Sequence, residues 1–166
     1  MAETSLALLD VYQGWENYQE LLVKALTPLT PDQLALRPAS HLRSIGENVR
    51  HIVGARVRWC QQVLELRQGD EALAALGRWD RRDAPERSAA ELVSGLRDSW
   101  QVLREALQQW TPADLTVSFP NTEREPGEPE RFTRQWVIWH LIEHDLHHGG
   151  EISQLLGIHH LAAPDL

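Results

Sequence analysis

The chain has 166 residues, a length that suits one domain able to bury about two-thirds of its unfolded surface. Its 24 acidic and 16 basic residues give a formal net charge of -8, which repels phosphate backbones unless a local basic patch exists. The longest candidate patch, residues 78–87, contains three acidic residues and nearly neutralises itself. The charge therefore excludes a general nucleic-acid-binding role, and we expect no nucleic-acid partner.

Cysteine content and hydropathy indicate the compartment. The single cysteine, Cys60, cannot form an intramolecular disulfide, and the first residues lack the basic and continuous apolar regions of a signal peptide. Apolar runs are only a few residues long, far shorter than the roughly 20 that a membrane-spanning helix needs. We expect a cytoplasmic protein with no membrane partner.

The first predicted helix spans residues 4–26 and ends before Pro28. Its apolar residues recur every three or four positions, as an inward-facing stripe requires: Leu8, Val11, Trp15, Tyr18 and Leu22. Residues 30–33 then indicate a short capped turn, because Thr30 precedes a proline at the first helical position.

Two further helices begin with capping boxes, in which a serine is followed three residues later by a glutamate. The first box, Ser44 and Glu47, opens a helix predicted to reach residue 68, with a core stripe of Ile45, Val49, Ile52, Trp59, Val63 and Leu66. The second, Ser88 and Glu91, opens a helix over residues 88–110 with a stripe of Leu92, Leu96, Trp100, Leu103 and Leu107. Pro112 closes that helix.

Residues 114–132 interrupt the helical pattern, because three prolines and a glycine within them forbid a helix. We predict a long loop, with a short strand at residues 116–119 and room for a small hairpin. Loops of this length inside a compact domain are often functional, and this one directly precedes the histidine-rich helix. It is our candidate lid.

The last predicted helix spans residues 133–156, with Thr133 as its cap and Gly157 as its stop. Four long helices without a sustained strand pattern predict an all-α four-helix bundle. No repeat, linker or second domain is evident, so residues 1–166 are expected to form a single domain.

Two histidines interrupt the apolar stripe of the last helix. His144 and His148 lie four residues apart, so their side chains are stacked on one face about 6 Å apart, close enough to bind one metal ion. The alternative is a pair of buried histidines with backbone or carboxylate partners. The neighbouring His140, His147 and Glu151 favour a metal site, because several imidazoles together in a low dielectric would each lose hydration without a compensating cation.

A metal site needs a third ligand from a facing helix. The second long helix offers His51, although periodicity alone slightly favours a surface histidine beside Arg50 over a ligand. The segment HDLHH, residues 144–148, also approaches the HExxH peptidase motif, but position 154 is glutamine where the extended motif has histidine. We therefore do not expect a peptidase.

Three segments of the chain resemble the DinB/YfiT-like superfamily: Leu36-Arg37-Pro38, the capped run from Ser44 to His51, and WHLIEHDLHHGGEISQLL over residues 139–156. The resemblance implies a DinB/YfiT-like helical bundle in which His51, His144 and His148 bind a divalent metal ion, usually zinc or nickel, with open coordination positions. The family's usual HRGQ is here His148-Gly149-Gly150-Glu151, so the arginine is absent. This departure leaves the ligand position intact and affects only a substrate-binding role.

Several activities are compatible with such a site. The resemblance implies a thiol-dependent transferase or isomerase that uses a low-molecular-weight thiol on a small-molecule substrate. A metal-dependent hydrolase is the alternative, with Glu47, Asp145 or Glu151 as a supporting carboxylate or general base. A structural or stress-related metal-binding protein without turnover is the non-enzymatic alternative, although three ligands are fewer than a structural zinc normally has.

Cys60 and His140 are not expected to bind the metal, and one face of the last helix is expected to contact a second copy of the chain. Cys60 is expected to be an inert apolar filler, and His140 lies two turns from His148, too far for a fourth ligand. The last helix also carries a second apolar face, for which we predict a homodimer interface, burial within one chain being the alternative: Ile138, Trp139, Ile142, Leu146, Gly149 and Gly150.

Overall fold

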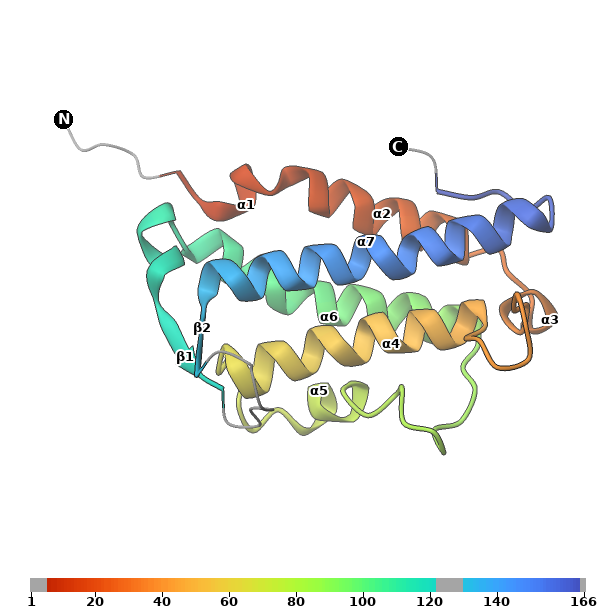
Figure 1. Cartoon of the computed structure of the whole chain (residues 1–166), viewed down its shortest axis with the longest axis horizontal. Helices are drawn as coiled ribbons and strands as arrows, with labels where there is room; N and C mark the ends of the chain where they lie inside the picture. Colours follow the sequence, from red (N-terminus) through yellow and green to blue (C-terminus); the bar gives the residue numbers. More distant parts are fainter. Residues whose placement is uncertain (1–5, 122–129, 165–166) are drawn as a thin grey trace.

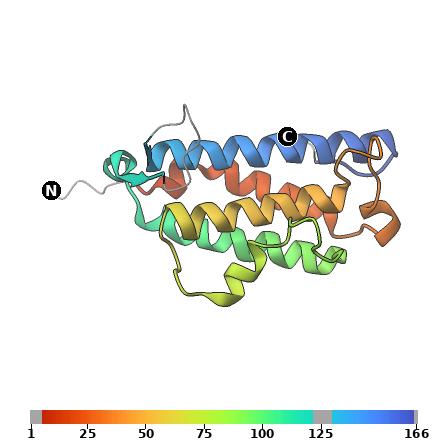
Figure 2. The same ribbon diagram turned by 60° about the horizontal axis from the view of Figure 1, so that its bottom comes forward.

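A computed structural model describes residues 6–121 and 130–164 and shows a helical bundle (Figures 1 and 2). Its four long helices are α2 (Gln13–Leu26), α4 (Ile45–Arg58), α6 (Ala89–Gln109) and α7 (Arg134–Ile158). Three short helices connect or extend them: α1 (Leu8–Val11), α3 (Pro31–Leu34) and α5 (Glu71–Leu76). The predicted all-α four-helix bundle is confirmed.

The helix starts follow the capping signals of the sequence. Ser44 Oγ accepts from the Glu47 backbone N–H at 3.2 Å, while the Ser44 N–H donates to Glu47 Oε2 at 2.7 Å. The same reciprocal pair forms at Ser88 and at Thr30, and Thr133 caps α7. These starts were predictable because a cap is made by residues only three positions apart.

The first predicted helix is broken at Tyr12, which leaves helical geometry with φ -103° and ψ 27°. The break separates α1 from α2 and turns Val11 outward, so that its side chain is 49% exposed rather than part of the core. A tertiary contact holds the short segment, because the Leu8 N–H donates to the Trp110 carbonyl at the end of α6 at 2.8 Å. Residues 4 and 5 of the prediction lie outside the described residues.

The second predicted helix is shorter than expected. After Arg58 it widens into a π-helical turn, η1 (Trp59–Val63), and then stops. Glu65, Arg67 and Gly69 all have positive φ angles, so the chain reverses direction where a helix to residue 68 was predicted. Asp70 then caps the unpredicted helix α5.

The segment before α7 forms the predicted small hairpin. After a 3-10 helix, η2 (Pro112–Thr116), strand β1 (Ser118–Pro120) pairs antiparallel with β2 (Arg131–Thr133), and Phe119 lies opposite Phe132. Residues 122–129 of the candidate lid lie outside the described residues. At its other end α7 continues through Gly157 to Ile158, so Gly157 is not the predicted stop.

The core contains a buried polar layer between two apolar clusters. Along α7, for example, Leu141 belongs to one cluster and Ile152 to the other, and the fully buried Asp145 lies between them. Arg56 of α4 donates to Asp145 through Nη2 at 2.7 Å and to Gln19 of α2 through Nη1 at 2.7 Å. Trp15 of α2 donates to the same Asp145 carboxylate at 2.6 Å. This polar layer joins α2, α4 and α7.

The second apolar face of α7 is only partly exposed. Ile138 and Gly149 are buried within the chain, whereas Trp139 is 58% and Leu146 43% exposed. None of the described helices is both long and apolar enough to cross a membrane.

Candidate metal centre

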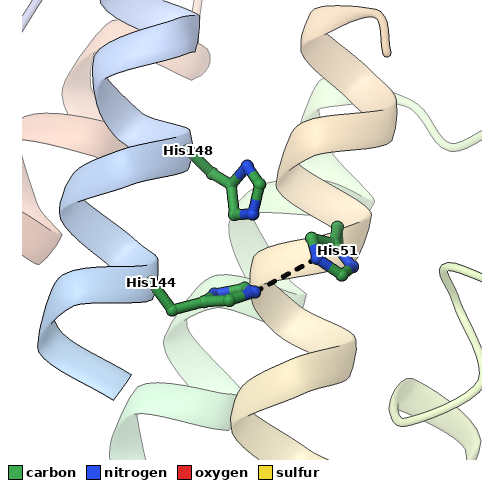
Figure 3. A group of neighbouring side chains, drawn as sticks. All are labelled: His51, His144 and His148. Carbon is green, nitrogen blue, oxygen red and sulfur yellow. Dashed lines mark hydrogen bonds between the residues drawn. The ribbon is translucent and has the colours of Figure 1, made fainter. Parts of the chain in front are cut away.

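Three histidines from two neighbouring helices meet between α4 and α7. Figure 3 shows His51 projecting from α4 toward His144 and His148 of α7. His51 Nε2 and His144 Nε2 are 3.1 Å apart, and ligand nitrogens of all three residues lie within 4.8 Å of one another. The i, i+4 spacing puts two imidazoles on one face of α7, and the packing of α4 against that face supplies the third. His51 is thus partly buried rather than a surface histidine beside Arg50.

A carboxylate orients His51 from behind. Asp80, in the segment after α5, places Oδ2 2.8 Å from His51 Nδ1. Arg58 in turn donates to both Asp80 oxygens, at 2.7 and 2.8 Å. Burial alone would raise the pKa of Asp80, but these hydrogen bonds outweigh burial and the pKa lies far below its usual value. A proton on Nδ1, donated to Asp80, leaves the Nε2 lone pair of His51 facing His144.

His148 has a carboxylate partner of its own. Its Nδ1 lies 2.8 Å from Glu151 Oε2, one helical turn along α7. His147 Nε2 is 3.6 Å from the other oxygen of Glu151, but its side chain is 68% exposed and lies on the outer side. Glu151 therefore orients His148 in the way that Asp80 orients His51.

The site favours neutral imidazoles. Burial lowers the pKa of His144 to about 3, with the nearby His148 and His51 adding to the effect. Burial also lowers the pKa of His148, although the hydrogen bond to Glu151 opposes it. Both rings are therefore unprotonated at neutral pH, which is the form that binds metal ions.

The donor set fits a divalent metal ion. Nitrogens around a tetrahedral zinc ion, each bonded at about 2.0–2.1 Å, lie about 3.3 Å apart, close to the 3.1 Å between the His51 and His144 Nε2 atoms. Within residues 6–121 and 130–164 no further histidine, cysteine, aspartate or glutamate joins the three. Three neutral nitrogen ligands with a coordination position left open are typical of catalytic rather than structural metal sites.

The other predicted carboxylates serve different contacts. Glu47 caps α4 and lies 3.3 Å from the Arg37 guanidinium, away from the histidine set. Asp145 follows His144 directly in sequence but points into the core, where Arg56 and Trp15 bind it. The structure thus brings Glu151, but neither Glu47 nor Asp145, into contact with the three histidines. Asp145 is therefore not available as the acidic residue that an HExxH-type peptidase motif would require in HDLHH.

Cys60 and His140 do not join the site. Cys60 is buried, and burial raises the pKa of its thiol to about 12, so it stays protonated as an apolar filler. The His140 ring stacks on Trp136 with centroids 5.0 Å apart and contacts Trp59 at 4.7 Å. With Phe132 stacked on Trp136, these rings form an aromatic strip from the β1–β2 hairpin to His144.

Two residues that support the site were not predicted. Asp80 was considered only for its charge, because its placement depends on a tertiary contact: the preceding Trp79 packs so closely on Gly95 of α6 that a methyl group there would overlap its ring. The apolar stripe of α4 has no apolar residue at the core position between Ile52 and Trp59, and Arg56 occupies that position. A charged residue at a core position of a stripe indicates a buried partner.

Comparisons with known proteins agree with this geometry. The DinB superfamily model matches residues 15–152, a span that contains all three histidines. The fold is similar to the crystal structure of a DinB-like protein from Bacillus cereus ATCC 10987, with 25% sequence identity, a TM-score of 0.71 and coverage of 93% of this chain and 94% of that chain. No curated protein matches the sequence. The predicted resemblance is confirmed, and the chain belongs to the DinB superfamily.

Proposed function

We propose that this protein is a metal-dependent enzyme that transfers a low-molecular-weight thiol to, or uses it to isomerise, a small electrophilic molecule. The observation that carries the proposal is the set of three converging imidazoles, His51, His144 and His148, with no fourth protein ligand among the described residues. A zinc or nickel ion held this way keeps its double charge and lowers the pKa of a thiol or water in its open position.

The placement of the carboxylates favours a thiol over water as the nucleophile. A hydrolase needs a general base within reach of the attacking water. Asp145 is committed to Arg56, and Asp80 to His51 and Arg58. Glu151, the remaining candidate, contacts His148. A thiol needs no such base, because a bound metal ion would lower its pKa so that its proton is lost to solvent before attack. In a transfer, the thiolate would then form the S–C bond as the leaving group departs with its electron pair; in an isomerisation, the S–C bond would form and later break again to release the thiolate.

A cavity beside the site suits a small-molecule substrate. It has a volume of about 600 Å3 and lies between the loop before α4 and the second half of α7, with Glu151 in its wall. Asn48 also lines it; that side chain is 2% exposed, and its Oδ1 has no hydrogen-bond partner within the described parts of the chain. An unpaired buried acceptor is costly, so a ligand that donates a hydrogen bond there would gain affinity.

Metal content tests the first half of the proposal. The purified protein is expected to contain about one equivalent of zinc or nickel, measured by elemental analysis, and the His51→Ala, His144→Ala and His148→Ala variants are each expected to lose it. His159→Ala, which removes an exposed histidine at the end of α7, is the matched control and should retain the metal. A wild-type protein that binds no metal even after reloading would contradict the proposal.

Thiol binding tests the second half. In the cobalt-substituted protein, addition of a thiol is expected to produce a sulfur-to-metal charge-transfer absorption, and thiol consumption with an electrophile such as 1-chloro-2,4-dinitrobenzene should depend on the metal. If ester hydrolysis is found without any thiol effect, the hydrolase is the correct alternative. If the metal is bound tightly and neither reaction occurs, a structural or stress-related role remains.

A further inference from the structure

Five arginines gather around one small cavity beside the histidines. The cavity measures about 230 Å3 and lies between the loop before α4, the start of α4 and the segment after α5. We call it the arginine pocket, after the basic residues that line it: Arg37, Arg43, Arg50, Arg81 and Arg82. In a chain with 16 basic residues and a net charge of -8, this is a marked local concentration of positive charge.

The acidic residues of the pocket do not neutralise it. Glu47 pairs with Arg37, and Asp80 is held by Arg58 and His51. The guanidinium groups of Arg43, Arg81 and Arg82 make no hydrogen bond or ion pair with any residue in the described part of the chain. Three guanidinium groups are therefore available to an anion.

Two of the other arginines have fixed positions. Arg50 donates to the backbone carbonyls of Ala84 and Pro85 at 2.9 and 3.1 Å, and Arg37 donates to that of Leu42 at 3.2 Å. The Arg50 bonds tie the segment after α5 to α4, and Arg37 also lies 3.3 Å from Glu47 in the first turn of α4. The pocket is thus a formed cavity rather than a chance meeting of mobile side chains.

A single side chain, that of Asp80, links the arginine pocket to the candidate metal centre. Asp80 forms part of its wall and also places Oδ2 2.8 Å from His51 Nδ1. On the other side of the loop, His41, Leu42 and Arg43 also line the 600 Å3 cavity that contains Glu151, the partner of His148. The loop before α4 therefore stands between two hollows, each of which reaches a carboxylate that contacts a metal-site histidine.

We propose that the arginine pocket binds a carboxylate at one end of the small molecule whose other end reacts at His51, His144 and His148. This inference rests on the proposed function. Pockets for whole small ligands measure about 300–1,000 Å3, so a 230 Å3 pocket suits a charged end group. The planar guanidinium fork matches a carboxylate in two parallel hydrogen bonds.

A carboxylate fits this pocket better than a phosphate. Phosphate sites commonly use free backbone N–H groups at a helix N-terminus. At the start of α4 the Ser44 hydroxyl accepts from the Glu47 N–H, and the Glu47 carboxylate lies over the same turn. The N-terminus is thus already capped by an anion of the chain, which leaves side-chain guanidinium groups as the donors.

Matched thiols measured on the zinc-loaded protein test the inference. Mercaptosuccinate carries two carboxylates and 2-mercaptoethanol none; calorimetric titration is expected to show about tenfold tighter binding of mercaptosuccinate. In the variant R43Q/R82Q, which removes one free arginine from each wall, that advantage should fall close to onefold. The charge-matched variant R78Q/R97Q, which changes two exposed arginines outside the pocket, should keep it.

Either absence of the advantage in the wild type or its persistence in R43Q/R82Q overturns the inference. Succinate, which has no thiol, separates this inference from the proposed function. If no thiol binds the metal, the proposed function fails, and a succinate affinity that falls in R43Q/R82Q still supports a carboxylate pocket, whereas an unchanged or undetectable affinity overturns it. Tighter binding of inorganic phosphate than of succinate would overturn the choice of carboxylate.

Discussion

Asp80 links His51, the candidate ligand on α4, to the segment that connects α5 with α6. One of its oxygens faces His51 Nδ1, and Arg58 contacts both. Such a carboxylate fixes the tautomer and the ring orientation of a ligating histidine and makes it a stronger electron donor. The position of His51 therefore depends on Asp80 of the segment after α5, which Arg58 holds in place, as well as on α4.

The substitution Asp80→Asn is expected to weaken metal binding 10- to 100-fold, roughly the range for loss of a carboxylate behind a ligating histidine. The amide keeps the size of the side chain but has no charge to pair with Arg58. Competition with a chromophoric chelator measures the affinity. Asp83→Asn, which changes an exposed aspartate three residues on, is the control, and equal affinities for the two variants would show that Asp80 does not act on the metal.

The pKa of His144 makes the stability of the metal-free protein depend on pH. Since the folded value is about 3 and the unfolded value about 6.5, the unfolded chain binds more protons between these values. The stability contributed by the neutral ring is therefore complete above about pH 6.5 and decreases as the pH falls toward 3. The free energy of unfolding in urea, measured at pH 7.5 and 5 after chelation, should fall less in His144→Gln than in wild type. An equal decrease would contradict the lowered pKa.

At the scale of residues, spacing alone predicted what lies on one element, whereas His51 was joined to the other two histidines only by the family resemblance and Asp80 was missed. His144 and His148 could be paired because four positions on a helix fix their separation. Asp80 could not be connected to His51, because their contact depends on the chain reversal after η1 and on Trp79 docking on α6. Nothing local in the sequence encodes that path.

At the scale of elements, the contact between α7 and α2 depends on a glycine at the position where the family usually has arginine. Gly149 faces Tyr18 of α2 so closely that an added methyl group would overlap the tyrosine hydroxyl. The departure from HRGQ thus has a packing consequence in this chain: α2 covers the place from which a longer side chain would project.

The substitution Gly149→Ala is expected to lower the free energy of unfolding by about 1–3 kcal/mol, the usual cost of overpacking. Chemical denaturation of the metal-free protein measures it. Gly150→Ala is the neighbouring control: no atom outside the helix lies within 4 Å of its added methyl, so it should stabilise α7 by about 0.5–1 kcal/mol. Tyr18→Phe combined with Gly149→Ala should recover part of the loss, and no recovery would show that the hydroxyl is not the obstacle.

The elements themselves were predicted best where caps and periodicity agree, as in α6 and the start of α4. Their ends were predicted less well, since α4 stops early at η1 and α7 runs past Gly157. A helix end is decided by tertiary packing as well as by local residues. The apolar stripe indicated one continuous helix through α1 and α2. The chain instead breaks at Tyr12, and α1 is held by a backbone hydrogen bond from Leu8 to Trp110.

At the scale of the whole molecule, the exposed part of the second face of α7 supports a homodimer. Trp139 and Leu146 lie two turns apart, are 58% and 43% exposed, and are followed on the same face by Gly150, above which there is open space. Large apolar residues aligned on one helix are a common feature of interfaces between subunits. We propose that two copies pack through this face.

Light scattering after gel filtration is expected to give about twice the chain mass of 19.0 kDa. The variant W139E/L146E should give the monomer mass with unchanged helix content, because both side chains are exposed within one chain. Val117→Glu, which charges an apolar residue of similar exposure next to β1, is the control and should remain a dimer. A monomeric wild type would refute the interface.

The buried pair of Arg56 and Asp145 has a consequence for competing misfolded states. Asp145 follows His144 directly, so a rotation of α7 by one residue, about 100°, would separate His144 from His51 and Asp145 from Arg56 at once. Such a state would leave the Arg56 charge in the core without its carboxylate partner, which costs about 3–5 kcal/mol. A rotation that separates His144 from His51 therefore also breaks the Arg56–Asp145 pair, so the core itself opposes misalignment of the histidines, whether or not a ligand is bound.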